Sequence, residues 1–424
     1  MKECAVSAVP PTVTGSIPAI NPEVDPSTLP EAAPNSEPES SNWIAVVALA
    51  LGIFTLITIE ELPIGVLTLI SNDLGVSRGT VGLAVTLPGV IAGVVALLVP
   101  SVTRPLNRKT VLLLALLSVV VSCTISFFST SWPLFLASRI FTGIAIGMNW
   151  PVLPLVAIGQ VKKEDRTTAL TIAFAGNGSA LVLGLPLATW LGTVLGWRGA
   201  FAATGILALV VGLMMVAMVR PVQSAAVETV RSTLGAVKIR GVRYAFVLTL
   251  IIVTGQFVSY SYVSPILQDF AHVDLEKISM YLLLYGALGL IGNFAAGPLI
   301  KRSAAVAVLV LAVGTALSLT LVATVMSAPV NALVIIAVWG FFGGMASVSI
   351  QSLVNAEAGD RVEAGTALNS AAFNISIGGG AIIGGLIVDS AGLRAAVWVS
   401  TAAVALGALI VTRFIALTHR RASK

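Results

Sequence analysis

The sequence is poor in charged side chains. Its 424 residues include 24 Lys and Arg and 19 Asp and Glu, 43 in all, whereas a soluble domain of this length would carry roughly 106, about a quarter of its residues. These charges are too few to cover an ordinary water-exposed surface. The net charge of +5 is modest and is spread along the chain beside apolar segments, so we expect no nucleic-acid partner.

Histidine and cysteine are almost absent, with two of each. His272 and His419 lie far apart in a predicted loop and a predicted tail, so a zinc site and a Ser-His-Asp arrangement lack their parts. Cys4 and Cys123 have neither metal-ligand spacing nor the setting of a disulfide, and we interpret them as inert thiols. The sequence therefore predicts neither an enzyme nor a resident metal or cofactor.

Apolar residues are abundant. They make up 57% of the chain, and the mean hydropathy is +0.98. One or two protein cores could not bury this much apolar surface, so the remainder must face lipid. The sequence predicts an integral membrane protein.

Apolar segments recur along the chain from Trp43 onward. At about 1.5 Å per residue, each is long enough to cross a hydrocarbon core about 30 Å thick. The sequence predicts an all-α membrane protein with twelve transmembrane helices. The predicted spans are 43–70, 80–102, 109–129, 132–158, 168–194, 199–219, 244–268, 278–300, 304–326, 330–354, 364–388 and 395–417.

The longest internal connection divides these spans into six and six, and the two halves resemble each other. Gly196-Trp197-Arg198 follows the fifth span and Gly392-Leu393-Arg394 follows the eleventh, 392 − 196 = 196 positions later. Such a repeat predicts two pseudo-symmetric six-helix bundles with a cavity between them near the membrane midplane. The predicted parts are a disordered Pro-rich tail (1–42), an N-terminal bundle (43–219), a linker (220–243), a C-terminal bundle (244–417) and a basic tail (418–424).

Basic residues are distributed unequally between the two predicted faces of the membrane. One face receives 19 of the 24 Lys and Arg, and Arg139 alone falls inside a span. Because cytoplasmic loops carry the excess of basic residues, we expect both termini and the linker to be cytoplasmic, in a multi-pass protein of the cell membrane. The opposite face receives Arg78, Arg198, Lys277 and Arg394.

Two adjacent acids, Glu60 and Glu61, fall inside the first predicted span. A charge at this depth costs at least about 2.5–3.5 kcal/mol, so a helix bundle keeps one only in a cavity or beside a partner. We interpret both as candidate proton carriers, with Arg139 as the nearby cation. Pro63 has no N–H to donate to the carbonyl of Ile59, which leaves an acceptor free beside the acids.

Uncharged polar and aromatic residues inside the spans are candidates for the lining of a substrate cavity. They could hydrogen-bond to and stack on a neutral polar ring, although each one could equally well join two helices. These residues are Asn149, Trp150, Asn177, Gln256, Tyr260, Asn293, Trp339, Gln351 and Asn374.

Four stretches resemble the major facilitator superfamily, in particular its twelve-span drug-proton antiporters, which include bacterial sugar, nucleoside and chloramphenicol exporters. They are Glu60 to Pro63 with Asn72 to Ser77; Arg139 with Gly143 and Gly147; Gly184-x-Pro186 ending at Gly196-Trp197-Arg198; and Ala367 to Asn374 with Gly378 to Gly380. The resemblance implies conformational roles for Pro63, Arg108, Lys109, Gly184 and Pro186.

Two positions depart from the family pattern. The loop after the second span departs from the Asp-based motif of relatives at four positions and retains only Arg108 and Lys109; the four are Pro100, Arg104, Pro105 and Asn107. Glu61 stands where relatives usually carry an aromatic residue.

The expected function is proton-coupled efflux of a small polar or drug-like molecule, such as a nucleoside, a sugar or an antibiotic. The proton gradient would supply the energy, no cofactor would be required, and a monomer would suffice because one chain contains both halves of the cavity. Two alternatives stay open: proton-coupled uptake by symport, and a membrane sensor that does not transport. Neither the cargo nor the acid that carries the proton follows from the sequence.

Overall fold

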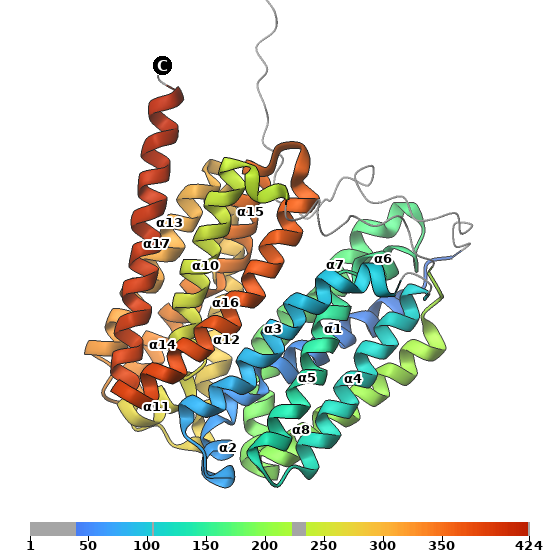
Figure 1. The fold of residues 1–424 in the computed structure, drawn as a ribbon, viewed down its shortest axis with the longest axis horizontal. Helices are drawn as coiled ribbons and strands as arrows, with labels where there is room; N and C mark the ends of the chain where they lie inside the picture. Colours follow the sequence, from blue (N-terminus) through green and yellow to red (C-terminus); the bar gives the residue numbers. More distant parts are fainter. Residues whose placement is uncertain (1–39, 104–105, 223–234, 423–424) are drawn as a thin grey trace, which may run out of the picture.

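The computed structural model describes residues 40–103, 106–222 and 235–422. These residues are almost entirely helical and contain no strand, which confirms the all-α prediction. They form two groups of helices that stand side by side (Figure 1). Most of the predicted tail at 1–42, half of the linker at 220–243 and part of the tail at 418–424 lie outside the described residues.

The first group contains eight α-helices: α1 (Trp43–Gly65), α2 (Leu67–Leu74), α3 (Arg78–Val102), α4 (Arg108–Phe128), α5 (Trp132–Asn149), α6 (Leu153–Ile158), α7 (Arg166–Ser179) and α8 (Leu185–Met218). A π-helical segment, η2 (Ala180–Gly184), joins α7 to α8. The second group contains α10 (Arg240–Tyr260), α11 (Val263–Ala271), α12 (Ile278–Arg302), α13 (Ala304–Thr324), α14 (Pro329–Gly344), α15 (Ala346–Ala358), α16 (Val362–Ala391) and α17 (Leu393–Ala422).

Ten helical stretches of the described chain are long and apolar enough to cross a membrane. One of them, Lys163–Met218, contains two predicted spans, which are separated at Gly196. The fourth predicted span corresponds to α5, which has 18 residues. Each of the twelve predicted segments therefore corresponds to one helix, to part of one, or to two consecutive helices.

The internal repeat of the sequence is also present in the backbone. Gly196 has φ 74° and ψ 162°, and Gly392 has φ 85° and ψ 169°. This conformation is almost restricted to glycine. The chain thus makes the same turn after the fifth and after the eleventh span, as expected from their 196-residue separation.

Four of the predicted spans are each formed by two consecutive helices with a break between them. The breaks lie at Val66, at 150–152, at 261–262 and at Met345, within the predicted spans 43–70, 132–158, 244–268 and 330–354. Prolines at 151, 154 and 265 lack the N–H that would continue the helical hydrogen bonds, and Gly343 and Gly344 precede the last break. Every third span is interrupted, so the breaks follow the repeat.

The two groups approach each other most closely along α3 and α16. The hydroxyl of Thr86 donates a 2.9 Å hydrogen bond to the carbonyl of Gly378, and a Cβ at Gly89 would lie 3.0 Å from the carbonyl oxygen of Asn374. From this contact the ribbons of the two groups diverge toward the end of the molecule where α17 finishes (Figure 1).

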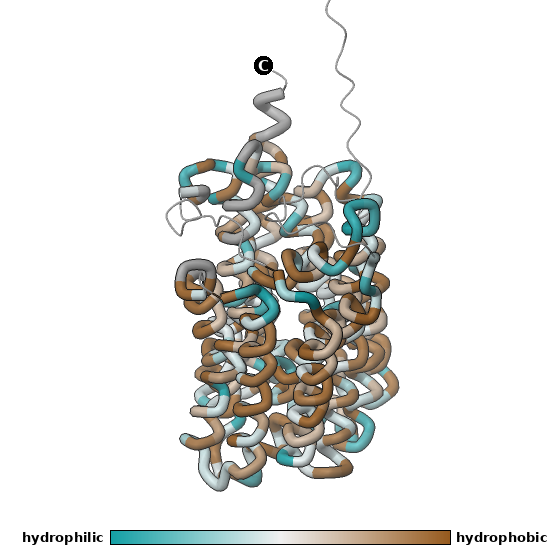
Figure 2. The backbone as a smooth tube through the Cα atoms, turned by 90° about the vertical axis from the view of Figure 1, so that its right-hand side faces the viewer, coloured by the Kyte–Doolittle hydropathy of each residue, from teal (hydrophilic) through white to brown (hydrophobic). Residues whose placement is uncertain are grey.

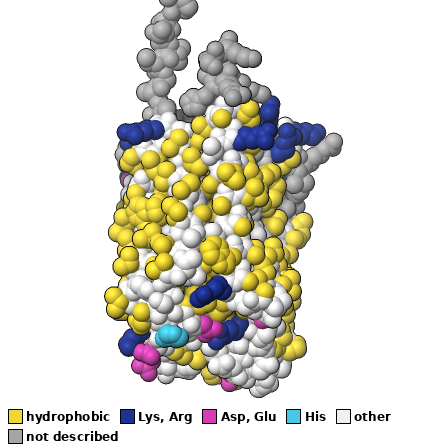
Figure 3. All heavy atoms as spheres, turned by 90° about the vertical axis from the view of Figure 1, so that its left-hand side faces the viewer, with side chains coloured by type: hydrophobic (Ala, Val, Ile, Leu, Met, Phe, Trp, Pro, Cys, Tyr) yellow, Lys and Arg dark blue, Asp and Glu magenta, His cyan; other side chains and the backbone are white. Residues whose placement is uncertain are grey.

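Apolar side chains cover the sides of the molecule. Hydrophilic segments lie mostly toward its two ends (Figure 2), and one face shows hydrophobic side chains across its middle with charged groups nearer the ends (Figure 3). Leu213, Leu317 and Leu386 each expose more than 60% of their surface. This pattern agrees with helices whose outer faces contact lipid.

Candidate functional site

Arg139 is fully buried in α5 and donates to backbone carbonyls of two neighbouring helices. Its Nε lies 3.0 Å from the oxygen of Ala84 in α3, and its Nη2 lies 3.1 Å from the oxygen of Ile59 in α1. Ile59 is the residue whose carbonyl Pro63 leaves without a helical donor. Arg139 therefore donates to the carbonyl oxygen that the sequence predicted to have no helical donor.

Glu60 follows Ile59 in α1 and interacts electrostatically with Arg139. No salt bridge joins the two side chains among those found in the described residues. The Nη1 atom of Arg139 is buried without a hydrogen-bond partner. Arg139 thus fixes the backbone next to Glu60 and acts on its charge through space.

Glu61 is directed toward the other group of helices. Successive helical residues point about 100° apart, and the Glu61 carboxyl interacts with the side chain of Tyr260 at the end of α10. Its Oε2 atom is buried and has no hydrogen-bond partner. The two adjacent acids therefore have different neighbours: Arg139 in the same group for Glu60, and Tyr260 in the opposite group for Glu61.

Three aromatic rings pack around Tyr260, the residue that Glu61 contacts, and together with it we call them the aromatic cluster: Phe257, Tyr260, Tyr285 and Trp339. Ring centroids lie 5.1 Å apart for Tyr260 and Tyr285, 5.5 Å for Tyr285 and Trp339, and 5.3 Å for Phe257 and Tyr260. The rings come from α10, α12 and α14, whose packing places them beside the acid of α1.

Polar atoms of the aromatic cluster and its neighbour Gln256 have unused hydrogen-bonding capacity. Gln256 donates to the Tyr285 hydroxyl over 3.4 Å, while its Oε1 atom and the Nε1 of the fully buried Trp339 have no partner. Unpartnered buried groups of this kind cost about 1–3 kcal/mol each. Together with Glu61, they offer one donor and two acceptors beside aromatic rings, a combination suited to a planar polar ring.

Of the predicted cavity residues, Gln256, Tyr260 and Trp339 come together in this way. The sequence prediction missed Tyr285, although one signal was available, because it is one of only five tyrosines and lies inside an apolar span. A tyrosine hydroxyl within a membrane span needs a polar partner.

The remaining predicted cavity residues lie elsewhere. Trp150 stacks on Phe174 with ring centroids 6.3 Å apart, on the first group of helices. Asn149 is buried at the end of α5, whereas Asn177 in α7 and Asn293 in α12 are half-buried.

Gln351 and Asn374 have partners within the second group. Gln351 donates to Asn355 at 2.7 Å and to Thr366 at 2.9 Å, and accepts from Asn369 at 2.9 Å. Asn374 donates to the carbonyl of Ser370 in its own helix at 2.9 Å.

Each of the four helix breaks lies at or close to a predicted site residue. Glu61 precedes the break at Val66, Trp150 lies at the break after α5, Tyr260 ends α10, and Trp339 lies near the end of α14. Interrupted helices free backbone groups that can contact a ligand or an ion at membrane depth.

The residues assigned to conformational motifs hold helices of the first group together. Arg108 donates to the hydroxyl of Thr103 at 3.1 Å, and Lys109 donates to the carbonyl of Val216 at 2.8 Å. Gly184 ends the π-helical segment, and a Cβ there would lie 2.7 Å from the hydroxyl of Thr58 in α1. Pro186 is buried in the first turn of α8.

Comparison with known proteins gives one consistent family. The model of the Major Facilitator Superfamily matches residues 49–364. The chain is 31% identical to the transcription regulatory protein OpdE of Pseudomonas aeruginosa, over 88% of this chain and 94% of that protein. It is 26% identical to the purine ribonucleoside efflux pump NepI of Salmonella paratyphi B, over 89% of this chain and 95% of the pump.

Two solved structures with a similar fold are of transporters. A D-xylose–proton symporter matches with a TM-score of 0.68 and 14% identity, over 88% of this chain and 97% of the symporter. The human organic anion transporter TETRAN matches with a TM-score of 0.63 and 15% identity, over 87% of this chain and 99% of the transporter.

Proposed function

The chain belongs to the major facilitator superfamily, and on this basis we propose that it is a proton-coupled secondary transporter that exports a small polar molecule by alternating access. The observation that carries the proposal is the position of the two adjacent acids. Glu60 interacts with Arg139 within the first group of helices, and Glu61 contacts Tyr260 in the second group. A proton on Glu61 changes a contact between the two groups, and a proton on Glu60 changes the interaction with Arg139 within the first group.

In this proposal Glu60 and Glu61 carry the proton. A charged carboxylate at membrane depth is expensive, so proton binding and release at these positions alters the interaction energy strongly. The proton gradient is the energy source, and no cofactor takes part. Segments 43–219 and 244–417 are the two bundles that move against each other, and a monomer contains the whole pathway.

The aromatic cluster and Gln256 form the proposed substrate site. Flat rings beside unpartnered polar atoms favour a neutral ring with hydrogen-bonding groups, such as a nucleoside. The name of the 26%-identical relative, a purine ribonucleoside efflux pump, supports both this class of cargo and the direction of transport.

We place the protein in the cell membrane with both termini in the cytoplasm. The support is the distribution of basic residues. The four basic residues of the opposite face are linked at one end of the molecule: Arg78 to Asp269, Arg198 to Asp73, Lys277 to Asp274, and Arg394 to the ring of Phe270. This end is therefore the outer one in our proposal. The partners that we propose are protons, the cargo and lipid.

A membrane sensor that does not transport is the second candidate, favoured by the name of the 31%-identical relative, transcription regulatory protein OpdE. Reconstitution into liposomes separates the two functions. We expect inside-out vesicles with an imposed proton gradient to accumulate a labelled nucleoside, sugar or amphenicol, and the Glu60→Gln/Glu61→Gln variant to lose this accumulation. The matched control is Glu276→Gln at the outer end. Wild-type protein that moves none of these compounds in either vesicle orientation would contradict the proposal.

A further inference from the structure

At the outer end, two carboxylates of the second group hold the beginning of α3 in the first group. Ser77, Arg78 and Gly79 form the start of this helix, Asp269 lies in α11, and Asp389 lies in α16. We call these five residues the α3 clasp. None of them belongs to the proposed proton or substrate site.

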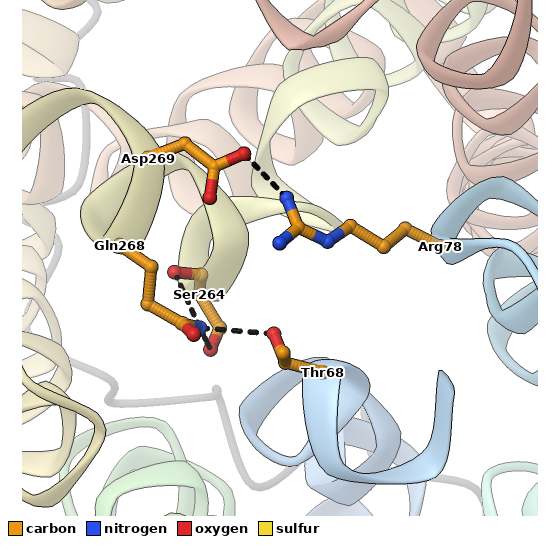
Figure 4. Close-up of polar contacts among 5 residues, drawn as sticks. All are labelled: Thr68, Arg78, Ser264, Gln268 and Asp269. Atoms are coloured by element: carbon orange, nitrogen blue, oxygen red, sulfur yellow. Dashed lines mark hydrogen bonds and ion pairs between the residues drawn. The ribbon is translucent and has the colours of Figure 1, made fainter. Parts of the chain in front are cut away.

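The first contact of the clasp is an ion pair. The Nη1 atom of Arg78 lies 2.5 Å from Oδ2 of Asp269, and the two side chains expose 32% and 43% of their surface. Figure 4 shows this pair, together with a neutral contact in which Gln268 donates to the hydroxyl of Thr68 at 2.9 Å. Both contacts join the two groups of helices.

The second contact is a helix cap supplied by the opposite group. Oδ1 of Asp389 accepts from the backbone N–H of Gly79 at 3.0 Å, and Oδ2 accepts from the hydroxyl of Ser77. Ser77 is itself the N-cap of α3 and accepts from the N–H of Thr80 at 3.0 Å. The first N–H groups of a helix have no partner within the helix and carry its partial positive charge, so a carboxylate stabilises them.

A glycine allows this approach. A Cβ at Gly79 would lie 2.5 Å from the carboxylate carbon of Asp389 and would also meet the carbonyl of Gly385. Next to it, the hydroxyl of Tyr262 in the second group donates to the carbonyl of Ala381 at 2.9 Å and reaches the carbonyl of Gly79 at 3.4 Å. The backbone of α3 at Gly79 therefore lies directly against α16.

We propose that the α3 clasp is the outer gate of the transporter: it keeps the outer end closed in this conformation and must separate in every transport cycle. The inference rests on the alternating-access function proposed above. Asp269 and Asp389 are positioning residues, since they act on transport through the place of α3 and do not touch the cargo.

A second ion pair at the same end provides a matched control. Arg198 and Asp73 lie 2.6 Å apart and expose 31% and 44% of their side chains, values close to those of Arg78 and Asp269. Both Arg198 and Asp73 belong to the first group of helices. Breaking this pair removes a similar interaction without releasing one group from the other.

The test measures access to the contact between the groups from outside. Thr86 lies deeper along α3, is buried, and bonds to Gly378 of α16, so Thr86→Cys reports on separation at this end. We expect a membrane-impermeant maleimide added from outside to label this cysteine about tenfold faster when Asp389→Ala is present and about threefold faster with Asp269→Asn. Asp389→Ala removes two charge-assisted bonds to the start of α3, whereas Asp269→Asn weakens one partly exposed ion pair. Asp73→Asn should leave the rate unchanged.

Three further variants separate a gate from a merely structural role. Arg78→Asp combined with Asp269→Arg should restore slow labelling, since the pair is re-formed in reverse. Asp389→Asn keeps an acceptor oxygen but loses the charge and should label at an intermediate rate. Ser77→Cys with Asp389→Cys, once oxidised to a disulfide, should stop transport without abolishing cargo binding, and a reducing agent should restore transport.

Three results would overturn the gate: equal labelling rates in Asp389→Ala and Asp73→Asn, a charge-reversed pair that labels as fast as the single variants, or a cross-linked protein that still transports. Labelling does not require a known cargo. A protein that moves no cargo but shows the expected labelling series would therefore contradict the proposed transport while leaving the clasp supported.

Discussion

Arg139 donates a 3.1 Å hydrogen bond from Nη2 to the carbonyl oxygen of Ile59. Inside a helix this oxygen would accept from the residue four positions later, which is Pro63 and has no N–H. The proline and the arginine, 76 positions apart (139 − 63), therefore form one unit that joins α5 to α1 directly before Glu60. Because of the same proline, α1 lacks one backbone hydrogen bond close to its end at Gly65.

Replacement of Pro63 by alanine restores an N–H that competes with Arg139 for the Ile59 carbonyl. We expect Pro63→Ala to keep or slightly raise the melting temperature, because a helical bond is gained, while the maximal transport rate falls several-fold. Thermal melting in detergent and initial rates in proteoliposomes measure the two effects. Pro329→Ala, in the first turn of α14 where a proline is tolerated, is the control. Unchanged transport in Pro63→Ala would show that the proline is only structural.

Arg139→Lys separates the charge from the geometry of the guanidinium. Lysine keeps the positive charge near Glu60 but cannot reach two carbonyls with a planar fork. We expect a loss of about 1–3 kcal/mol in the free energy of unfolding, the cost of an unpartnered buried carbonyl, and a similar or larger loss in Arg139→Ala. Lys109→Ala, which removes an exposed contact to the Val216 carbonyl, should cost much less. Equal stability of all three variants would contradict the bracing role.

The two acids should differ in their effect on transport because they have different neighbours. With both acids replaced, in Glu60→Gln/Glu61→Gln, accumulation driven by a proton gradient should disappear, while exchange of labelled for unlabelled cargo across the membrane should continue. Glu61→Gln alone keeps a hydrogen-bonding group beside Tyr260 and should bind cargo with little change in Kd. Single-variant assays at several external pH values then identify the acid whose loss removes the pH dependence. If gradient-driven accumulation survives the double replacement, the proton is carried elsewhere.

The aromatic cluster predicts graded losses of cargo affinity. Trp339→Phe keeps a ring but removes the unpartnered Nε1–H, and Tyr285→Phe removes the hydroxyl to which Gln256 donates. We expect each to raise KM about two- to tenfold, the value of one hydrogen bond, with kcat nearly unchanged. Trp190→Phe, at a site that exposes 51% of its side chain, is the control. A fall in kcat with constant KM would mean that these residues act on the conformational change and not on cargo binding.

Gly196 and Gly392 should respond alike to replacement by alanine. Their φ angles of 74° and 85° are unfavourable for any residue with a Cβ, so each variant should lose about 1–2 kcal/mol of stability. Gly297→Ala is the control, since a Cβ there meets no atom within 4 Å and its φ is negative. Melting temperatures of the three variants provide the measurement. A neutral Gly392→Ala beside a destabilising Gly196→Ala would contradict the structural equivalence of the two turns.

The candidate site was predictable in part. An intramembrane carboxylate and an intramembrane arginine are rare, so Glu60, Glu61 and Arg139 stand out in the sequence alone. Rarity does not single out any of the nine uncharged polar and aromatic candidates, since each could join helices or contact cargo. The structure gathers Gln256, Tyr260 and Trp339 around Tyr285, and gives Gln351 and Asn374 partners within their own group. Only the packing of helices distant in the sequence produces this difference.

The sequence by itself determined the membrane setting, the all-helical class, the number and place of the apolar segments and the repeat, because hydropathy, span length and repeated motifs are local properties of the chain. The tertiary structure decided which carbonyl Arg139 would bind, where four of the spans would break, and that Asp389 would cap α3 across the two groups. These relationships depend on the angle and register at which remote helices pack, and hydropathy carries no information about either.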